Sequence, residues 1–125
     1  MTKRVLVIED EQSNRQSLEI VLRHHGYEVT SSENGADIIS LLNSLKPDLV
    51  ILDMLLKGYD GRLICQEIKK SSKFKNIPVI MMSGHSDIYN TIAEDGANDV
   101  LVKPYTEISL ISRIERQIGG SRRLV

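Results

Sequence analysis

The sequence predicts an α/β fold in which a single, doubly wound parallel sheet of five strands carries helices on both faces. Runs of apolar, often β-branched residues alternate with segments of helical periodicity along the whole chain. Three of these apolar runs are continuous, which is typical of central strands that are covered on both faces. A strand–helix unit repeated five times implies right-handed crossovers between parallel strands, and 2-1-3-4-5 is a common order for such a sheet.

The predicted strands are short apolar runs that polar or turn-forming residues bound on both sides. They lie at residues 5–8, 27–31, 49–52, 79–82 and 100–102. The run at 49–52 reads LVIL and ends abruptly at the carboxylate of Asp53.

Five helical segments follow these strands in turn. The first is expected to end at Gly26, a residue suited to a left-handed C-terminal cap. The others are predicted at 35–45, from residue 60 onward, at 87–94 and up to residue 118. The apolar spacing predicts one buried stripe on each helix. The stripes of the third and fifth helices comprise Leu63, Ile64 and Ile68, and Ile108, Ile111, Ile114 and Ile118.

Length and charge limit the possible classes of protein. The chain of 125 residues suits one domain, expected at 1–119 and followed by a flexible tail at 120–125. Its 16 basic and 17 acidic side chains leave a net charge of -1, which argues against nucleic-acid or membrane-surface binding by this domain. No apolar stretch approaches the roughly 18–20 residues of a membrane span. The single cysteine, Cys65, cannot form an internal disulfide, and a cytoplasmic location is the simplest interpretation.

Polar side chains follow four of the predicted strands directly. Glu9 and Asp10 come after the first strand, Asp53 after the third, Ser83 after the fourth and Lys103 after the fifth. In a parallel sheet the carboxyl ends of the strands meet at one edge, where ligands bind. Because the first and third strands are neighbours in the predicted order, the three carboxylates are expected to converge.

Three adjacent carboxylates repel one another unless a cation offsets their charge. Mg²⁺ takes oxygen ligands, keeps several of its waters and leaves room for a phosphoryl oxygen. Three negative charges, two positive charges from Mg²⁺ and one from Lys103 sum to zero. Such a site could admit a phosphoryl donor to a carboxylate that would otherwise repel it, and a carboxylate nucleophile then forms an acyl phosphate.

The same residues lie in four segments that resemble the receiver domain of two-component response regulators, whose fold is flavodoxin-like. The segments are VLVIEDE, LVILDMLLKGYDG, VIMMSG and VLVKPY, and the resemblance extends over residues 3–118. It implies that Asp53 is phosphorylated by a sensor histidine kinase or a phosphotransfer protein. It also implies a regulator that assists its own phosphorylation and dephosphorylation, and not an enzyme in the ordinary sense.

The resemblance also implies roles for the neighbouring residues. Asp10, Asp53 and the backbone carbonyl of Leu55 would bind Mg²⁺, while Glu9 would act mainly through a bound water. Lys103 would hold a phosphoryl oxygen and precede Pro104 through a cis peptide bond. The hydroxyl of Ser83 would report phosphorylation to a face formed by helix 4, strand 5 and helix 5. A downstream protein target, an output domain or a second copy of the chain would bind that face.

Four positions depart from the family pattern or tune it. Val100 occupies the place where an aromatic residue often couples to the Ser83 hydroxyl, so the switch must use the loop after Ser83 and repacking of the fourth helix. Leu55 and His85 occupy positions that tune self-dephosphorylation, and we expect a slow to moderate decay of the phosphoryl group. Lys57 replaces a common proline, with little expected effect beyond loop stiffness.

Other classes of protein share this fold. A phosphatase with an aspartate nucleophile needs a carboxylate two residues after it, where this chain has Leu55. A flavodoxin needs a Gly/Ser/Thr-rich loop after the first strand to bind phosphate, whereas this chain has the acidic segment EDEQSN. A receiver-like module that binds proteins without being phosphorylated stays open as the alternative.

Overall fold

The computed structural model describes residues 2–119, so the predicted tail at 120–125 lies outside the described residues. The main sheet has five parallel strands in the order β2-β1-β3-β6-β7. These are β1 (Arg4–Ile8), β2 (Glu28–Ser32), β3 (Leu49–Asp53), β6 (Val79–Ser83) and β7 (Asp99–Val102). Counted along the chain within this sheet, the order is 2-1-3-4-5, and the predicted fold class is confirmed.

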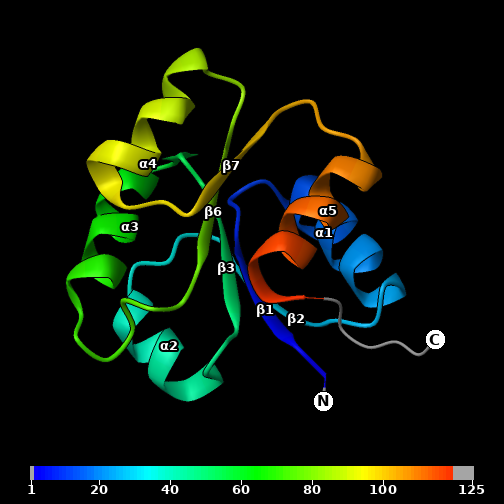
Figure 1. Cartoon of the computed structure of the whole chain (residues 1–125), viewed down its shortest axis with the longest axis horizontal. Coiled ribbons are helices and arrows are strands. Elements are labelled where there is room, and N and C mark those ends of the chain that lie inside the picture. The colour runs from blue at the N-terminus through cyan, green and yellow to red at the C-terminus, as the bar shows by residue number, and fades with distance from the viewer. Residues whose placement is uncertain (1, 120–125) are drawn as a thin grey trace.

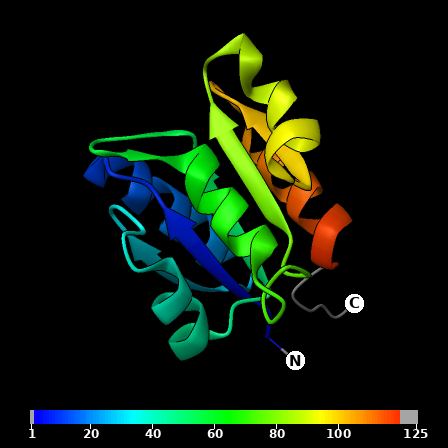
Figure 2. The ribbon, with the colours of Figure 1, turned by 90° about the vertical axis from the view of Figure 1, so that its left-hand side faces the viewer.

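Helices cover both faces of the sheet, as Figures 1 and 2 show. One face carries α1 (Gln12–His24) and α5 (Glu107–Ile118). The opposite face carries α2 (Ile38–Leu45), α3 (Gly61–Lys70) and α4 (Asn90–Asp95). Among the described residues, no helix combines the length and the apolar character that a membrane crossing requires.

Strands β1, β3, β6 and β7 contribute alternate residues to two separate apolar cores, whereas β2 contributes Val29 to one of them. On β1, Val5 and Val7 pack in the core beneath α1 and α5, whereas Leu6 and Ile8 pack in the core beneath α2, α3 and α4. The alternation follows from the period of two along a strand, and it explains why the central strands are apolar at every position. Cys65 is fully buried in the second of these cores, and burial raises the pKa of its thiol to about 11.

The helices differ from the sequence prediction at three places. α2 begins at Ile38 instead of residue 35, because Gly35 adopts a left-handed conformation with φ +63°. The predicted fourth helix is divided into a 3-10 turn, η1 (Ser86–Tyr89), and the short α4. The predicted stripes were wrong at Leu63 and Ile108, which are 60% and 82% exposed.

A small hairpin that the sequence analysis did not predict connects β3 to α3. Its strands are β4 (Leu55–Leu56) and β5 (Tyr59–Asp60), and the two turn residues are Lys57 and Gly58. The Asp60 carboxylate accepts a hydrogen bond from the Arg62 amide at 2.9 Å and so caps the start of α3. The hairpin therefore holds the chain beside the carboxyl end of β3.

Candidate functional site

The three predicted carboxylates meet at the carboxyl ends of β1 and β3. Asp53 is the last residue of β3, and Glu9 and Asp10 follow the paired strand β1. One carboxylate oxygen from each of the three residues lies within 4.8 Å of the other two. The donors are all carboxylate oxygens, the ligands that a hard cation such as Mg²⁺ prefers. The residues present therefore fit a Mg²⁺ ion.

Lys103 provides the positive charge of this cluster. Its Nζ lies 2.7 Å from Asp53 Oδ2 and 3.1 Å from Glu9 Oε1. Burial by itself would lower the pKa of the Lys103 ammonium, but the hydrogen bonds and charges of Asp53 and Glu9 outweigh burial and raise this pKa. The peptide bond between Lys103 and Pro104 is cis, as expected.

Negative charge remains in excess around Glu9. This side chain is only 1% exposed, and burial raises its pKa, with the neighbouring Asp53 charge acting in the same direction. The hydrogen bond from the Glu11 amide and the Lys103 charge act against this rise without cancelling it. The surroundings of Glu9 thus disfavour its ionised form, and a cation bound beside it would stabilise that form.

The β4–β5 hairpin donates backbone hydrogen bonds to two of the three carboxylates. The Leu55 amide donates to Asp53 Oδ1 at 3.0 Å, and the Lys57 amide donates to Asp10 Oδ2 at 2.9 Å. The pKa of Asp10 is lowered although burial alone would raise it, and the Lys57 hydrogen bond is the largest opposing cause. One short connection therefore contacts carboxylates that follow two different strands.

Ser83 ends β6 beside β3, but its hydroxyl is engaged by the next loop. Ser83 Oγ accepts a hydrogen bond from the His85 amide at 3.0 Å, which ties the hydroxyl to the backbone two residues further on. The side chain of His85 is exposed, whereas Val100 is buried in the same core as Ile88 of η1. The Ser83 hydroxyl is thus connected to the core around Val100 through His85 and the following turn η1.

Two residues that the sequence analysis did not select also shape the site. Arg15 of α1 donates through Nη1 to the backbone oxygens of Glu9 and Asp10, at 2.9 and 3.2 Å. A Cβ atom at Gly61 would lie 2.2 Å from the backbone oxygen of Asp53, so only glycine permits this close approach. In the sequence Gly61 indicated only a helix start, and Arg15 resembled any solvated helix residue.

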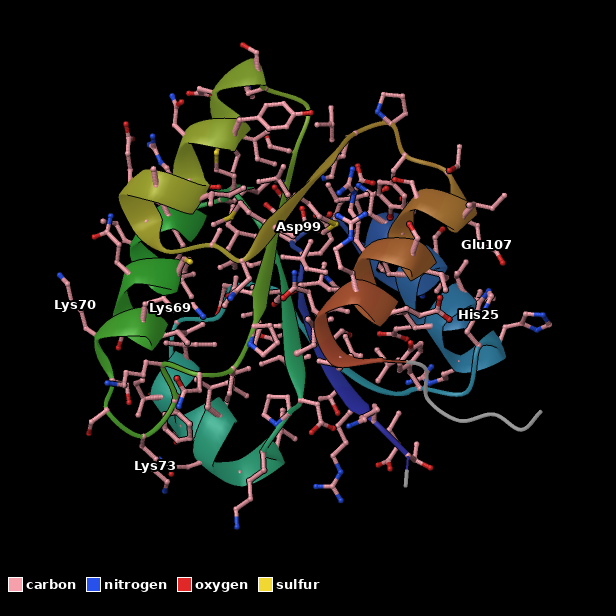
Figure 3. The ribbon with its side chains drawn as sticks, in the orientation of Figure 1. His25, Lys69, Lys70, Lys73, Asp99 and Glu107 are labelled. Atoms are coloured by element: carbon pink, nitrogen blue, oxygen red, sulfur yellow. The ribbon has the colours of Figure 1, made fainter. Side chains whose placement is uncertain are left out.

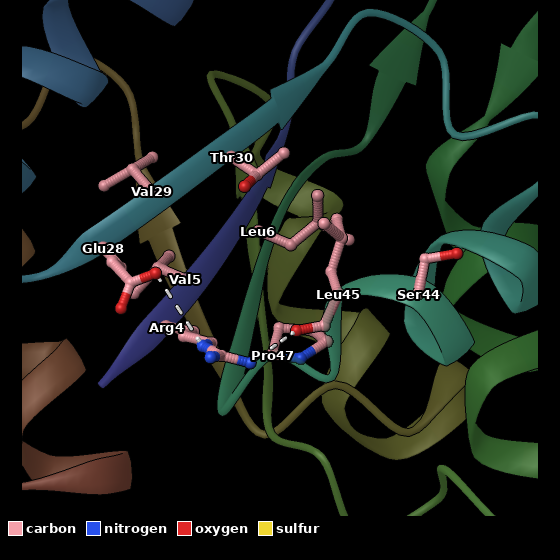
Figure 4. A pocket seen from close by; sticks show the side chains of 9 residues that line it. All are labelled: Arg4, Val5, Leu6, Glu28, Val29, Thr30, Ser44, Leu45 and Pro47. Atoms are coloured by element: carbon pink, nitrogen blue, oxygen red, sulfur yellow. Dashed lines mark hydrogen bonds and ion pairs between the residues drawn. The ribbon is translucent and has the colours of Figure 1, made fainter. Parts of the chain in front are cut away.

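Of two cavities, one lies against the site and the other lies away from it. One of about 410 Å³ lies against the site and is lined by Glu9, Asn14, Lys103, Pro104 and Tyr105. The other, of about 170 Å³, lies at the amino ends of β1 and β2 (Figure 4), where Arg4 and Glu28 form an ion pair at 3.8 Å. The second cavity contains its own paired charges and lies away from the three carboxylates.

Comparison with known proteins gives a consistent result. A model of the family "Response regulator receiver domain" matches residues 5–115. Over 114 residues the chain is 39% identical to the "Probable transcriptional regulator ycf27" of Porphyridium aerugineum. The matched segment makes up 90% of this chain and 46% of that protein. It is 30% identical to the DNA-binding response regulator MtrA of Mycobacterium tuberculosis, over 94% of this chain and 51% of MtrA. The chain thus spans about half the length of these relatives.

Two solved structures extend the comparison to the fold. The signal receiver domain of a signal transduction histidine kinase from Syntrophus aciditrophicus has a TM-score of 0.87 and 29% identity, covering 99% of this chain and 96% of that one. The receiver domain of the sensor histidine kinase PA1611 from Pseudomonas aeruginosa has a TM-score of 0.85 and 27% identity, covering 96% of this chain and 100% of that one. That structure contains a magnesium ion coordinated in its active site cleft.

Proposed function

Because this chain belongs to the response regulator receiver domain family of two-component systems, we propose that it accepts a phosphoryl group on Asp53. The donor would be the phosphohistidine of a sensor histidine kinase or of a phosphotransfer protein. The observation that carries this proposal is the environment of Asp53, whose Oδ2 lies 2.7 Å from Lys103 Nζ within the cluster of three carboxylates.

The proposed step is a displacement at phosphorus. A carboxylate oxygen of Asp53 forms a bond to phosphorus while the bond from phosphorus to the imidazole nitrogen breaks, and the electron pair of that bond stays on the imidazole. The product is an acyl phosphate on Asp53. Lys103 Nζ, already within hydrogen-bond distance of the Asp53 carboxylate, would then hold a phosphoryl oxygen. A donor group that entered the cavity beside Lys103 and Tyr105 would meet Glu9 and Lys103, and Lys103 is hydrogen-bonded to this carboxylate.

A magnesium ion would be held by Glu9, Asp10, Asp53 and the backbone carbonyl of Leu55. When bound, the ion supplies positive charge that neutralises the phosphoryl oxygens. The three carboxylates contribute three negative charges. Lys103 would offset one of these charges, and the ion would offset two. The acceptor carboxylate would then meet an incoming phosphoryl group at a site of no net charge.

Signalling would begin at Ser83. If its hydroxyl turns toward the phosphoryl group, it gives up the hydrogen bond from the His85 amide, which has a length of 3.0 Å. The segment after Ser83 then loses an anchor at the start of η1, whose Ile88 is fully buried in the same core as Val100. Since Val100 carries no ring that could rotate, we propose that repacking of Ile88 transmits the change to the face formed by α4, β7 and α5.

The partner on that face would be a downstream protein, an output domain or a second copy of the chain. The apolar side chains of Tyr89, Ile92 and Val102 are 60%, 45% and 37% exposed on η1, α4 and β7. The relatives are about twice as long as this chain, and MtrA is a DNA-binding protein. An output domain attached to the receiver fits both observations, and the phosphoryl group would control it from a distance.

Intact-mass measurement tests the proposal directly. The metal-stripped protein is incubated with acetyl phosphate, with and without Mg²⁺, and compared with Asp53→Asn. We expect one added phosphoryl group, only on the wild-type chain and only with Mg²⁺. An unmodified wild-type protein under these conditions would contradict the proposal and favour a module that binds partners without phosphorylation. Decay of the adduct within seconds would contradict the slow to moderate lifetime expected from Leu55 and His85.

A further inference from the structure

We propose that the backbone amide of Lys57 is a positioning group for the Mg²⁺ ligand Asp10, and that it makes the β4–β5 hairpin part of the cation site. The inference rests on the proposed function, because it assigns a role toward the ion that Asp10 is expected to bind. Its basis is the hydrogen bond from the Lys57 nitrogen to Asp10 Oδ2, at 2.9 Å across 47 residues of sequence.

The hydrogen bond restricts a carboxylate that has few other restraints. Asp10 is only partly buried, whereas Glu9 and Asp53 are 1% and 5% exposed. Glu9 and Asp53 are both held by Lys103, and Asp53 receives the Leu55 amide in addition. The Asp10 side chain also interacts with Glu9 and with its own backbone, but the Lys57 amide is the donor that fixes its Oδ2 from a distant part of the sequence.

The geometry of the turn makes this donor available. Leu56 pairs with Tyr59, so the ladder of the hairpin does not extend to Lys57, and its N–H is directed to a side chain instead. Gly58 has φ +76°, while Lys57 is absent from the described non-glycine residues with positive φ. This sign pattern is that of a type II turn, which accepts proline at its first central position. Proline is common at this position in the family, and it has no N–H to donate.

The consequence for this chain is a link between the acidic loop after β1 and the connection from β3 to α3. Alternate amides of one hairpin, those of Leu55 and Lys57, contact Asp53 and Asp10 respectively. Hydrogen-bond partners of metal ligands typically contribute about 10–100-fold to metal affinity. Because Asp10 is partly exposed, we expect about tenfold, at the lower end of this range. Lys57 therefore does more than change the stiffness of the loop.

The test compares two substitutions at one position in the full chain. Lys57→Pro removes both the side-chain charge and the N–H, whereas Lys57→Ala removes the charge and keeps the N–H. Calorimetric titration of Mg²⁺ into the metal-stripped proteins should give a dissociation constant about tenfold higher for Lys57→Pro than for Lys57→Ala. Equal constants, or tighter binding by Lys57→Pro, would overturn the positioning role while leaving the proposed phosphorylation intact. A wild-type chain that binds no Mg²⁺ would overturn both.

A second measurement needs neither the ion nor a folded Lys57→Pro protein. Amide hydrogen exchange in metal-free wild-type protein should be at least tenfold slower at Lys57 than in Asp10→Ala, in which the acceptor is absent. Exchange at the same rate in both proteins would show that the hydrogen bond does not form in solution, and would overturn the inference. For the titration, thermal unfolding of Lys57→Pro in EDTA is the control, because a cooperative transition would show that weaker binding does not come from loss of the fold.

Discussion

Two lysines, Lys103 and Lys69, occupy opposite ends of the sheet and are held in opposite ways. Lys103 Nζ contacts the carboxylates of Asp53 and Glu9 beyond the carboxyl ends of the strands. Lys69 lies on α3, facing inward in Figure 3, and its Nζ donates to uncharged oxygens near the amino ends of β6 and β7. Its acceptors are the backbone oxygens of Ile77 and Lys75 and the side chain of Asn98, at 2.8, 3.2 and 2.7 Å.

The pKa values of the two ammonium groups shift in opposite directions for this reason. Burial lowers the pKa of Lys69, and no carboxylate among its hydrogen-bond partners offsets this. Burial also acts to lower the pKa of Lys103, but the hydrogen bonds and charges of Asp53 and Glu9 outweigh burial and raise this pKa. A lysine bound to neutral acceptors fastens elements of the fold together. A lysine outnumbered by carboxylates belongs to a site that still requires positive charge, and such a site can bind a cation or a phosphoryl group.

The largest effect that separates the two lysines should appear in phosphorylation. Lys103→Met removes a preformed donor to the phosphoryl group, and the initial rate of modification by acetyl phosphate should fall by about 10²-fold or more. Lys69→Met changes a residue at the far end of the sheet and should keep the wild-type rate. Mass spectrometry over time measures both rates. Similar losses in the two variants would contradict the distinction.

A smaller effect, on stability, should follow from the hydrogen bonds of Lys69. Lys69→Met leaves the oxygens of Ile77 and Asn98 without this donor and should lower the free energy of unfolding by about 1–2 kcal/mol. Lys70→Met is the matched control, since this neighbouring side chain is exposed and points away from the fold in Figure 3; its change should stay within about 0.5 kcal/mol. Urea denaturation of both variants checks the difference, and equal changes would show that the hydrogen bonds of Lys69 contribute little.

The smallest effect is on the pH dependence of stability, and it arises from the negative charge of Glu9 beside Lys103. Because the pKa of Glu9 is raised in the folded protein, its stabilising contribution is fully present below its unfolded pKa of about 4.5 and is lost as the pH rises through the folded value. In EDTA, Glu9→Gln should therefore be more stable than wild type at neutral pH, and this advantage should disappear near pH 4. Thermal unfolding across this range measures it. A wild-type protein that gains stability relative to Glu9→Gln on going to neutral pH would contradict the sign.

The sequence predicted the fold and the residues of the site better than it predicted the hydrogen bonds that join those residues. Continuous apolar runs located the strands, and the rule that ligands bind beyond the carboxyl ends brought together Glu9, Asp10, Asp53 and Lys103. Periodicity could not decide which of two adjacent stripes faces inward, so Ile108 was predicted to be buried where Leu110 is. Contacts made by backbone amides were beyond sequence analysis, because every residue except proline carries the same donor.

The two apolar cores have a consequence for how this domain can change over evolutionary time. Among residues 2–119 they share no side chain, since the sheet lies between them. Substitutions beneath α1 and α5 should therefore combine additively with substitutions beneath α2, α3 and α4. In β7, adjacent residues such as Val100 and Leu101 belong to different cores. Each half of the molecule is thus free to acquire new partners while the other half keeps its packing.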